Sequence, residues 1–129
     1  MAERLILTPF EKALISLETV LELPKDAVVR DATIQRFAYT YELAWKMIKR
    51  HLEWASGSNL SSLTRKEIFR EAERTGLIPD AEAWFDYTEA RNLTSHTYDE
   101  ARAEEVYSVA RNFAADARKL FQALSRHHD

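Results

Sequence analysis

Apolar residues along this chain recur mainly at spacings of three and four, which is the period of a helix that buries one face. The first such run extends from Phe10 to Leu21. Thr8 precedes it as a candidate N-cap, Pro9 fits the first helical position, and Glu11 can complete a capping box. The pattern therefore predicts a first helix that starts at Thr8 and ends before Pro24.

A wider apolar band follows Asp31, which is a good N-cap. Apolar residues form one helical stripe from Ile34 to Leu52, and Tyr39 and Trp54 add apolar surface beside it. A helix that buries only one face does not need so wide a band. The sequence predicts a long second helix that is covered by a second helical partner, for example another subunit.

The second half of the chain predicts three further helices. Thr64 and Glu67 form a capping box that opens a short helix, and Gly76 suits its left-handed C-cap. Asp80 starts a fourth helix, and Asp99 can cap a fifth, whose apolar periodicity is the cleanest in the chain. Four to five helices with short connections predict an all-α fold, an antiparallel up-and-down bundle.

Composition supports this picture. A chain of 129 residues suits one domain over residues 1–129, and 46% hydrophobic residues can fill a core. Two glycines and three prolines favour long helices, and the lack of cysteine excludes disulfides and thiolate metal sites. The apolar run at residues 5–7 is too short for a signal peptide, and no later run has membrane-spanning length. We therefore expect a cytoplasmic protein with no membrane association.

Several candidate sites have simpler interpretations. Three acids share one face of the fourth helix and could hold a hard cation, but a solvated helix face is preferred: Glu82, Asp86 and Glu89. His51 lies near a helix end, where a cation interacts favourably with the helix dipole. His127 and His128 are assigned to a frayed C-terminal tail. The chain has no glycine-rich phosphate loop and no His-Glu-x-x-His zinc motif.

One polar segment, at the end of the fourth helix, concentrates residues that suit phosphate chemistry. Arg91 offers a planar fork that binds phosphate, and His96 can move a proton to or from a ribose hydroxyl. Tyr98 offers a phenol that can bind phosphate or accept a nucleotide. Five residues on a helix correspond to about 140° of rotation, so Arg91 and His96 converge only if the helix ends near Thr94 or a second subunit joins. Asn92 and His96 have the spacing for a hydrogen bond.

The segment fits the pattern Arg, four residues, His, one residue, Tyr, in the string RNLTSHTYDE. It resembles the HEPN superfamily, specifically the nucleotidyltransferase substrate-binding protein family and its toxin-like relatives. The similarity covers nearly the whole chain, including residues 31–45 and 70–78. It implies a bundle similar to the helical domain of aminoglycoside nucleotidyltransferases, a homodimer, and a separately encoded minimal nucleotidyltransferase as partner. The nucleoside triphosphate and Mg²⁺ are expected on that partner, with no intrinsic cofactor or metal here.

In the toxin-like branch the matching Arg and His act in metal-independent RNA cleavage, and the partner attaches AMP to the matching Tyr. The resemblance thus implies that Arg91 binds the scissile phosphate and that His96 is the acid/base. The residues assigned to modification or binding are Tyr98, Asn92, Ser95 and Asp99. The net charge of −3 and the acidic surroundings of the motif weigh against tight binding of RNA by the chain alone.

Three hypotheses follow. The first is a helical substrate-binding subunit of a two-component nucleotidyltransferase. The alternative is a metal-independent ribonuclease toxin that its partner silences by nucleotidylation of Tyr98. The third is a structural helical dimer, in which Arg91 pairs with a neighbouring acid (Glu89, Asp99 or Glu100) and His96 merely ends a helix. The chain lacks the glycine and paired-aspartate signature of the transferase, so it is not that catalytic subunit.

Overall fold

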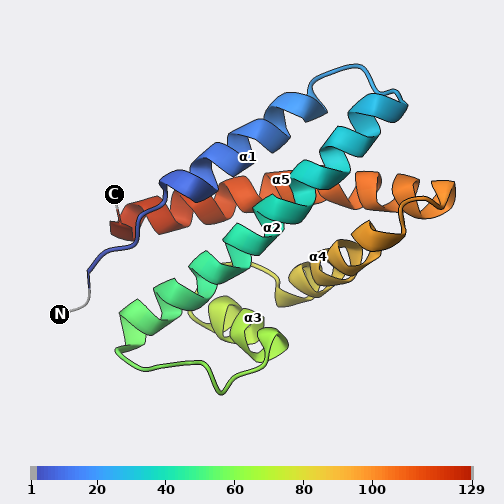
Figure 1. Cartoon of the computed structure of the whole chain (residues 1–129). Helices are drawn as coiled ribbons and strands as arrows, with labels where there is room; N and C mark the ends of the chain where they lie inside the picture. The colour runs from blue at the N-terminus through green and yellow to red at the C-terminus, as the bar shows by residue number, and fades with distance from the viewer. Residues whose placement is uncertain (1–2, 129) are drawn as a thin grey trace.

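The computed structural model describes residues 3–128, which fold into five α-helices joined by short connections (Figure 1). A short 3-10 helix precedes the last α-helix, and no strand occurs within these residues. The elements are α1 (Thr8–Leu21), α2 (Ala27–Ser56), α3 (Arg65–Arg74), α4 (Ala81–Leu93), η1 (Thr94–His96) and α5 (Glu100–His128). The predicted all-α fold is confirmed.

The first two helices begin at other residues than predicted. The N-cap of α1 is Leu7, with no side-chain hydrogen bond, so Thr8 is already helical and the expected capping box is wrong. The N-cap of α2 is Asp26, whose carboxylate accepts a hydrogen bond from Val29 N at 2.8 Å. Its buried face begins with Arg30 rather than an apolar residue, so apolar periodicity could not reveal the first turn.

The later helix ends follow the predicted local chemistry. Thr64 and Glu67 form the capping box of α3 through reciprocal hydrogen bonds of 3.1 and 2.8 Å. Gly76 adopts a φ of 82°, in the left-handed region, and the chain folds back over α3 behind it. Asp80 and Asp99 accept hydrogen bonds from backbone amides at the starts of α4 and α5.

Most of the wide apolar band of α2 is covered within one chain, whereas Tyr39 beside it stays exposed. Helix α2 packs against α1, α3, α4 and α5, and crosses the middle of the molecule in Figure 1. Phe37, Tyr41 and Ile48 on this band are fully buried. The predicted helical partners therefore exist, but they belong to the same chain, and this band by itself does not require a second subunit.

An aromatic cluster centred on Phe113 joins α2, α4 and α5. Its ring lies 5.1 Å from that of Phe37, 5.3 Å from Tyr87 and 5.7 Å from Trp84, all in edge-to-face geometry. This packing holds α4 against the two long helices and so positions the polar segment that follows α4. In Figure 1 that segment lies at one end of α5, and the start of α1 lies toward the other end.

None of the helices within residues 3–128 combines the length and the hydropathy that a transmembrane segment needs.

Candidate functional site

In the polar segment after α4 the helix ends because side-chain hydroxyls compete with backbone amides for the backbone carbonyls. The hydroxyl of Thr94 donates to the Arg91 carbonyl at 2.7 Å, and the hydroxyl of Ser95 donates to the Asn92 carbonyl at 3.2 Å. Thr97 donates in the same way to the Thr94 carbonyl at 3.4 Å. These bonds replace the regular helical pattern, and the chain passes through η1 before Asp99 starts α5. The predicted loosening of the helix is confirmed.

Arg91 is anchored at the end of α4 and is partly exposed. Its Nη1 donates to the Thr94 hydroxyl at 3.0 Å, and its Nε lies 3.3 Å from Glu42 Oε1 on α2. That Nε is buried and its geometry toward Glu42 does not make a hydrogen bond. The ion pair is therefore formed with α2 rather than with an acid of its own segment, and the 34% exposed side chain keeps an accessible edge for an anion.

His96 and Tyr98 lie next to each other on the surface. Their ring centroids are 6.1 Å apart with the planes at 70°, and Tyr98 is 85% exposed. Within residues 3–128 the His96 imidazole forms no hydrogen bond or ion pair. The hydrogen bond expected from Asn92 to His96 is absent because η1 disrupts the helical i,i+4 geometry.

The structure thus brings some of the predicted site residues into contact and leaves others apart. His96 and Tyr98 are in ring contact, whereas in the described part of the chain no hydrogen bond or ion pair joins Arg91 to His96. The carboxylate of Asp99 is used to cap α5, and it also lies 3.8 Å from Arg102. In one chain, the guanidinium, the imidazole and the phenol are therefore spread along the connection between α4 and α5. They do not surround one pocket.

The surroundings of the segment are acidic. A shallow cavity of about 390 Å³ beside Asn92 is lined by Asp86, Glu89 and Glu105. The nearby guanidinium of Arg30 is already bound by Glu100, Glu104 and Asp31, and its hydrogen bonds lower the pKa of the Glu100 carboxyl. Local charge therefore does little to attract RNA.

Across residues 3–128, no group of three or more His, Asp or Glu side chains is arranged to hold a metal ion. The three acids Glu82, Asp86 and Glu89 therefore do not form such a group. The preferred interpretation of that trio, a solvated helix face, fits the exposed positions of all three.

A histidine cluster that the sequence did not reveal joins the ends of α2 and α5. His128 is buried and helical, so its assignment to a frayed tail is wrong. Its Nδ1 accepts a hydrogen bond from Leu5 N at 3.1 Å, and its Nε2 lies 2.8 Å from Nδ1 of His51. Burial, followed by the neighbouring His128 and His127, lowers the pKa of His51 to about 4. The predicted role of His51 as a cation at a helix end is therefore wrong as well.

This cluster predicts a loss of stability in mild acid. Burial, His127 and Arg4 also lower the pKa of His128, so both histidines stay neutral in the folded chain while the unfolded chain takes up protons near pH 6.5. The contribution of the two neutral histidines to the free energy of unfolding is fully present above pH 6.5. It is lost as the pH falls toward 4. We expect the urea midpoint to fall between pH 7 and 5, a window above the titration of the carboxylates.

The matched variant is His51→Gln, which keeps a polar side chain but does not titrate. Its urea midpoint should vary less between pH 7 and 5 than that of the parent chain. Equal pH dependence in the two proteins would show that this cluster is not the cause.

Comparison with known proteins identifies one matching family model and a similar relative. A family model described as "Nucleotidyltransferase substrate binding protein like" matches residues 5–126. A Haemophilus influenzae protein named probable ribonuclease HepT is 35% identical to this chain, covering 96% of the chain and 94% of the relative. These matches span nearly the full length of both proteins.

Two solved structures share the fold. One is a Haemophilus influenzae protein, described as revealing the fold of a substrate binding domain of a nucleotidyltransferase. It superposes with a TM-score of 0.86 and 33% identity, covering 93% of this chain and 99% of that protein. The other, from Thermus thermophilus, has a TM-score of 0.81 and 32% identity, covering 89% of this chain and 98% of that protein.

Proposed function

Because this chain belongs to the family of nucleotidyltransferase substrate binding proteins, we propose that it is a metal-independent endoribonuclease of toxin type, controlled by a partner nucleotidyltransferase. The observation that carries the proposal is the exposed His96 imidazole, free of hydrogen bonds in the described chain and beside the exposed Tyr98 phenol. Its relative named probable ribonuclease HepT supports the same activity.

The chemistry proposed is transesterification within RNA. The His96 imidazole accepts the proton of a ribose 2′-hydroxyl, and the oxygen attacks the adjacent phosphorus. The bond from phosphorus to the 5′-oxygen breaks, and that oxygen takes a proton from water. The products are a 2′,3′-cyclic phosphate and a 5′-hydroxyl, with no redox change. The Arg91 guanidinium stabilises the charge that builds on the phosphate oxygens.

A homodimer fits this chemistry better than one isolated chain. Within one chain, no hydrogen bond or ion pair in the described residues joins Arg91 to His96. Two copies that meet at this segment would place two arginines and two histidines around one phosphate. We therefore propose that the active form is a homodimer with both segments at its interface.

The test uses the full chain expressed alone. Expression should arrest bacterial growth, and the purified protein should cleave RNA in the presence of EDTA, leaving 2′,3′-cyclic phosphate ends. Absence of both growth arrest and cleavage would contradict the ribonuclease proposal.

A second candidate function is that of a helical subunit which holds a substrate for a separately encoded minimal nucleotidyltransferase. The acidic surroundings of the segment and the description of the solved Haemophilus influenzae structure favour it. It predicts a stable complex with the transferase that binds a nucleotide, together with no growth arrest. Failure to form any complex with such a transferase would count against this function and against control of the ribonuclease by a partner.

Tyr98→Phe should separate activity from control. In the single chain, the phenol is 85% exposed and forms no hydrogen bond among the described residues, so a partner enzyme can reach it there. We expect the variant to cleave RNA as the parent does, but not to gain an AMP group when incubated with the partner, ATP and Mg²⁺. The intact mass of the protein measures this.

Tyr39→Phe serves as control, because Tyr39 is another surface-exposed tyrosine, on α2. This variant should be modified as the parent is. An undiminished mass increase in Tyr98→Phe would rule out Tyr98 as the acceptor.

A further inference from the structure

A second cavity, distinct from the proposed RNA site, opens between the ends of α2, α3 and α5. It has a volume of about 570 Å³, which lies in the range of small-molecule sites. At 1.5 Å per residue, its position near the end of α5 is roughly 40 Å from the start of that helix, where the RNA segment lies. The apolar walls are formed by Leu52, Leu60, Leu63, Leu77 and Ala123.

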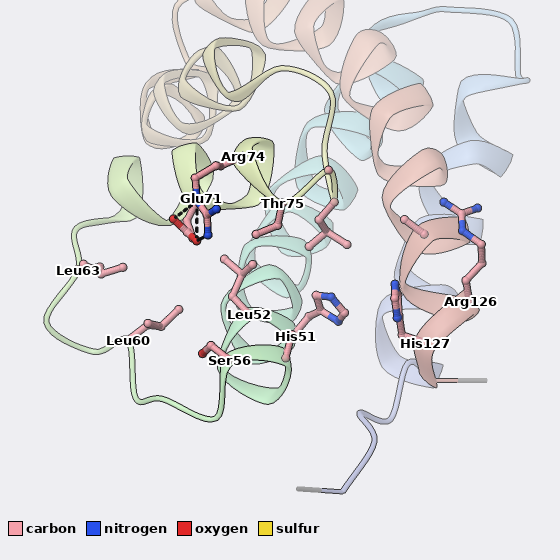
Figure 2. A pocket seen from close by; sticks show the side chains of 14 residues that line it. His51, Leu52, Ser56, Leu60, Leu63, Glu71, Arg74, Thr75, Arg126 and His127 are labelled. Carbon is pink, nitrogen blue, oxygen red and sulfur yellow. Dashed lines mark hydrogen bonds and ion pairs between the residues drawn. The ribbon is translucent and has the colours of Figure 1, made fainter.

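One wall of this cavity is the loop after α2, and hydrogen bonds hold that loop in place. Leu60 N donates to Glu53 Oε2 at 2.9 Å, and Leu63 N donates to the Leu60 carbonyl at 3.0 Å. Figure 2 shows the Leu60 and Leu63 side chains on this loop, with Arg126 and His127 on α5 at the other side of the space. The apolar wall is therefore already in place without a ligand.

His51 is a buried hydrogen-bond donor on the cavity wall. It is only 6% exposed, and it lines the cavity from α2 (Figure 2). Leu5 N–H donates to Nδ1 of His128, so the proton of neutral His128 lies on Nε2 and is donated to Nδ1 of His51. His51 must then carry its own proton on Nε2, and within residues 3–128 that N–H has no partner. This hydrogen-bond chain leaves the Nε2–H of His51, a residue that lines the cavity, as a donor without a hydrogen-bond partner in the described chain.

The charges around the cavity favour one negative group. Arg74 is held by Glu71 through two hydrogen bonds of 3.1 Å from its Nε, so these two charges largely cancel. Arg126 is exposed and forms no hydrogen bond or ion pair in the described chain. Behind the loop, the carboxylate of Glu53 accepts the hydrogen bond from Leu60 N. Among the charged residues that line the cavity, Arg126 is therefore the one left without a partner in the described chain.

From these observations we propose that the cavity binds a small amphipathic carboxylate. The carboxylate accepts a hydrogen bond from His51 Nε2–H, while the apolar body lies against the leucine wall. The exposed Arg126 side chain, which extends away from the cavity in Figure 2, turns toward the bound carboxylate and pairs with it. A neutral His51 donor and one unpaired guanidinium fit a monoanion better than a multiply charged phosphate. The proposal does not depend on the RNA chemistry, because the two sites share no residue.

The test is an NMR titration of the full chain with octanoate, which has a charged head and an apolar tail. The signals of His51 and of the cavity-lining Gly76 amide should shift with saturation, with a Kd of roughly 0.1–5 mM for a ligand of this size. Octylamine, which has the same tail and the opposite charge, should shift them at least about tenfold more weakly. No saturable shift with octanoate, or equal binding of both compounds, would overturn the proposal.

Two surface variants locate the site without disturbing the core. Arg126→Ala should weaken octanoate binding about tenfold, because it removes the unpaired charge. Ala55→Trp places a large ring at an exposed position that lines the cavity, and should abolish binding. Arg50→Ala is the matched control, since Arg50 is exposed, precedes His51 and does not line the cavity. If Arg126→Ala and Ala55→Trp both bind octanoate as the parent and Arg50→Ala do, the ligand lies elsewhere and the proposal fails.

Discussion

Replacing His96 with alanine is expected to lower RNA cleavage by about 10²–10⁴-fold, the usual contribution of a positioned general acid or base. His96 carries the only imidazole of the proposed RNA site in each chain, and it is an exposed residue whose ring contacts that of Tyr98. Its removal should therefore leave the fold intact, because an exposed side chain contributes little to stability. The measurement is the rate of RNA cleavage by purified protein, with circular dichroism as a check of folding.

His127→Ala is the matched control for this experiment. His127 is also an exposed histidine, but it lies near the other end of α5, remote from the proposed RNA site. This variant should cleave RNA and arrest growth as the parent does. If His96→Ala retains full activity, the proposed acid/base is wrong, and any remaining cleavage has another origin.

Replacing Phe113 with alanine should destabilise the fold by about 3–5 kcal/mol, the usual cost of removing a buried aromatic ring. Phe113 is fully buried, and its ring lies within 6.2 Å of four others, on α2 and α4. The cavity left behind is surrounded on two sides by long helices that cannot collapse into it. For a chain of this length we expect the melting temperature to fall by roughly 10–20 °C.

Phe113→Leu gives the comparison, since it retains most of the apolar volume and should cost clearly less than the alanine variant. Urea unfolding of the three proteins measures the difference. Because the same cluster holds α4 in place, partial loosening of the alanine variant should also lower RNA cleavage. Equal stability of the alanine and leucine variants would show that the aromatic cluster is not the centre of the core.

The cavity at the end of α5 and the polar segment at its beginning, the proposed RNA site, give the molecule two chemically different ends. One end is surface-exposed and acidic around a guanidinium, an imidazole and a phenol. The other is concave and apolar, with Arg126, unpaired in the described chain, at its rim and the buried His51 on its wall. The variants proposed for each end are distant from the other end, so their effects can be measured independently.

Much of the fold was determined by the sequence itself. Helical periodicity predicted every α-helix, and the caps at Thr64, Asp80 and Asp99 followed from local hydrogen bonding. The polar segment after Leu93 could also be identified, because serine and threonine hydroxyls compete with the helix through contacts only three residues apart. These features depend on residues that are near neighbours in the chain.

Only the tertiary structure decided the features that join distant residues. The hydrogen bond between His51 and His128 links positions 77 residues apart, and it converts two apparently peripheral histidines into a buried pair. Likewise, Arg91 pairs with Glu42 on another helix rather than with an acid in its own segment. Periodicity shows which face of a helix is buried. It does not show which other helix packs against that face. That choice depends on how all the helices pack at once, which no local pattern contains.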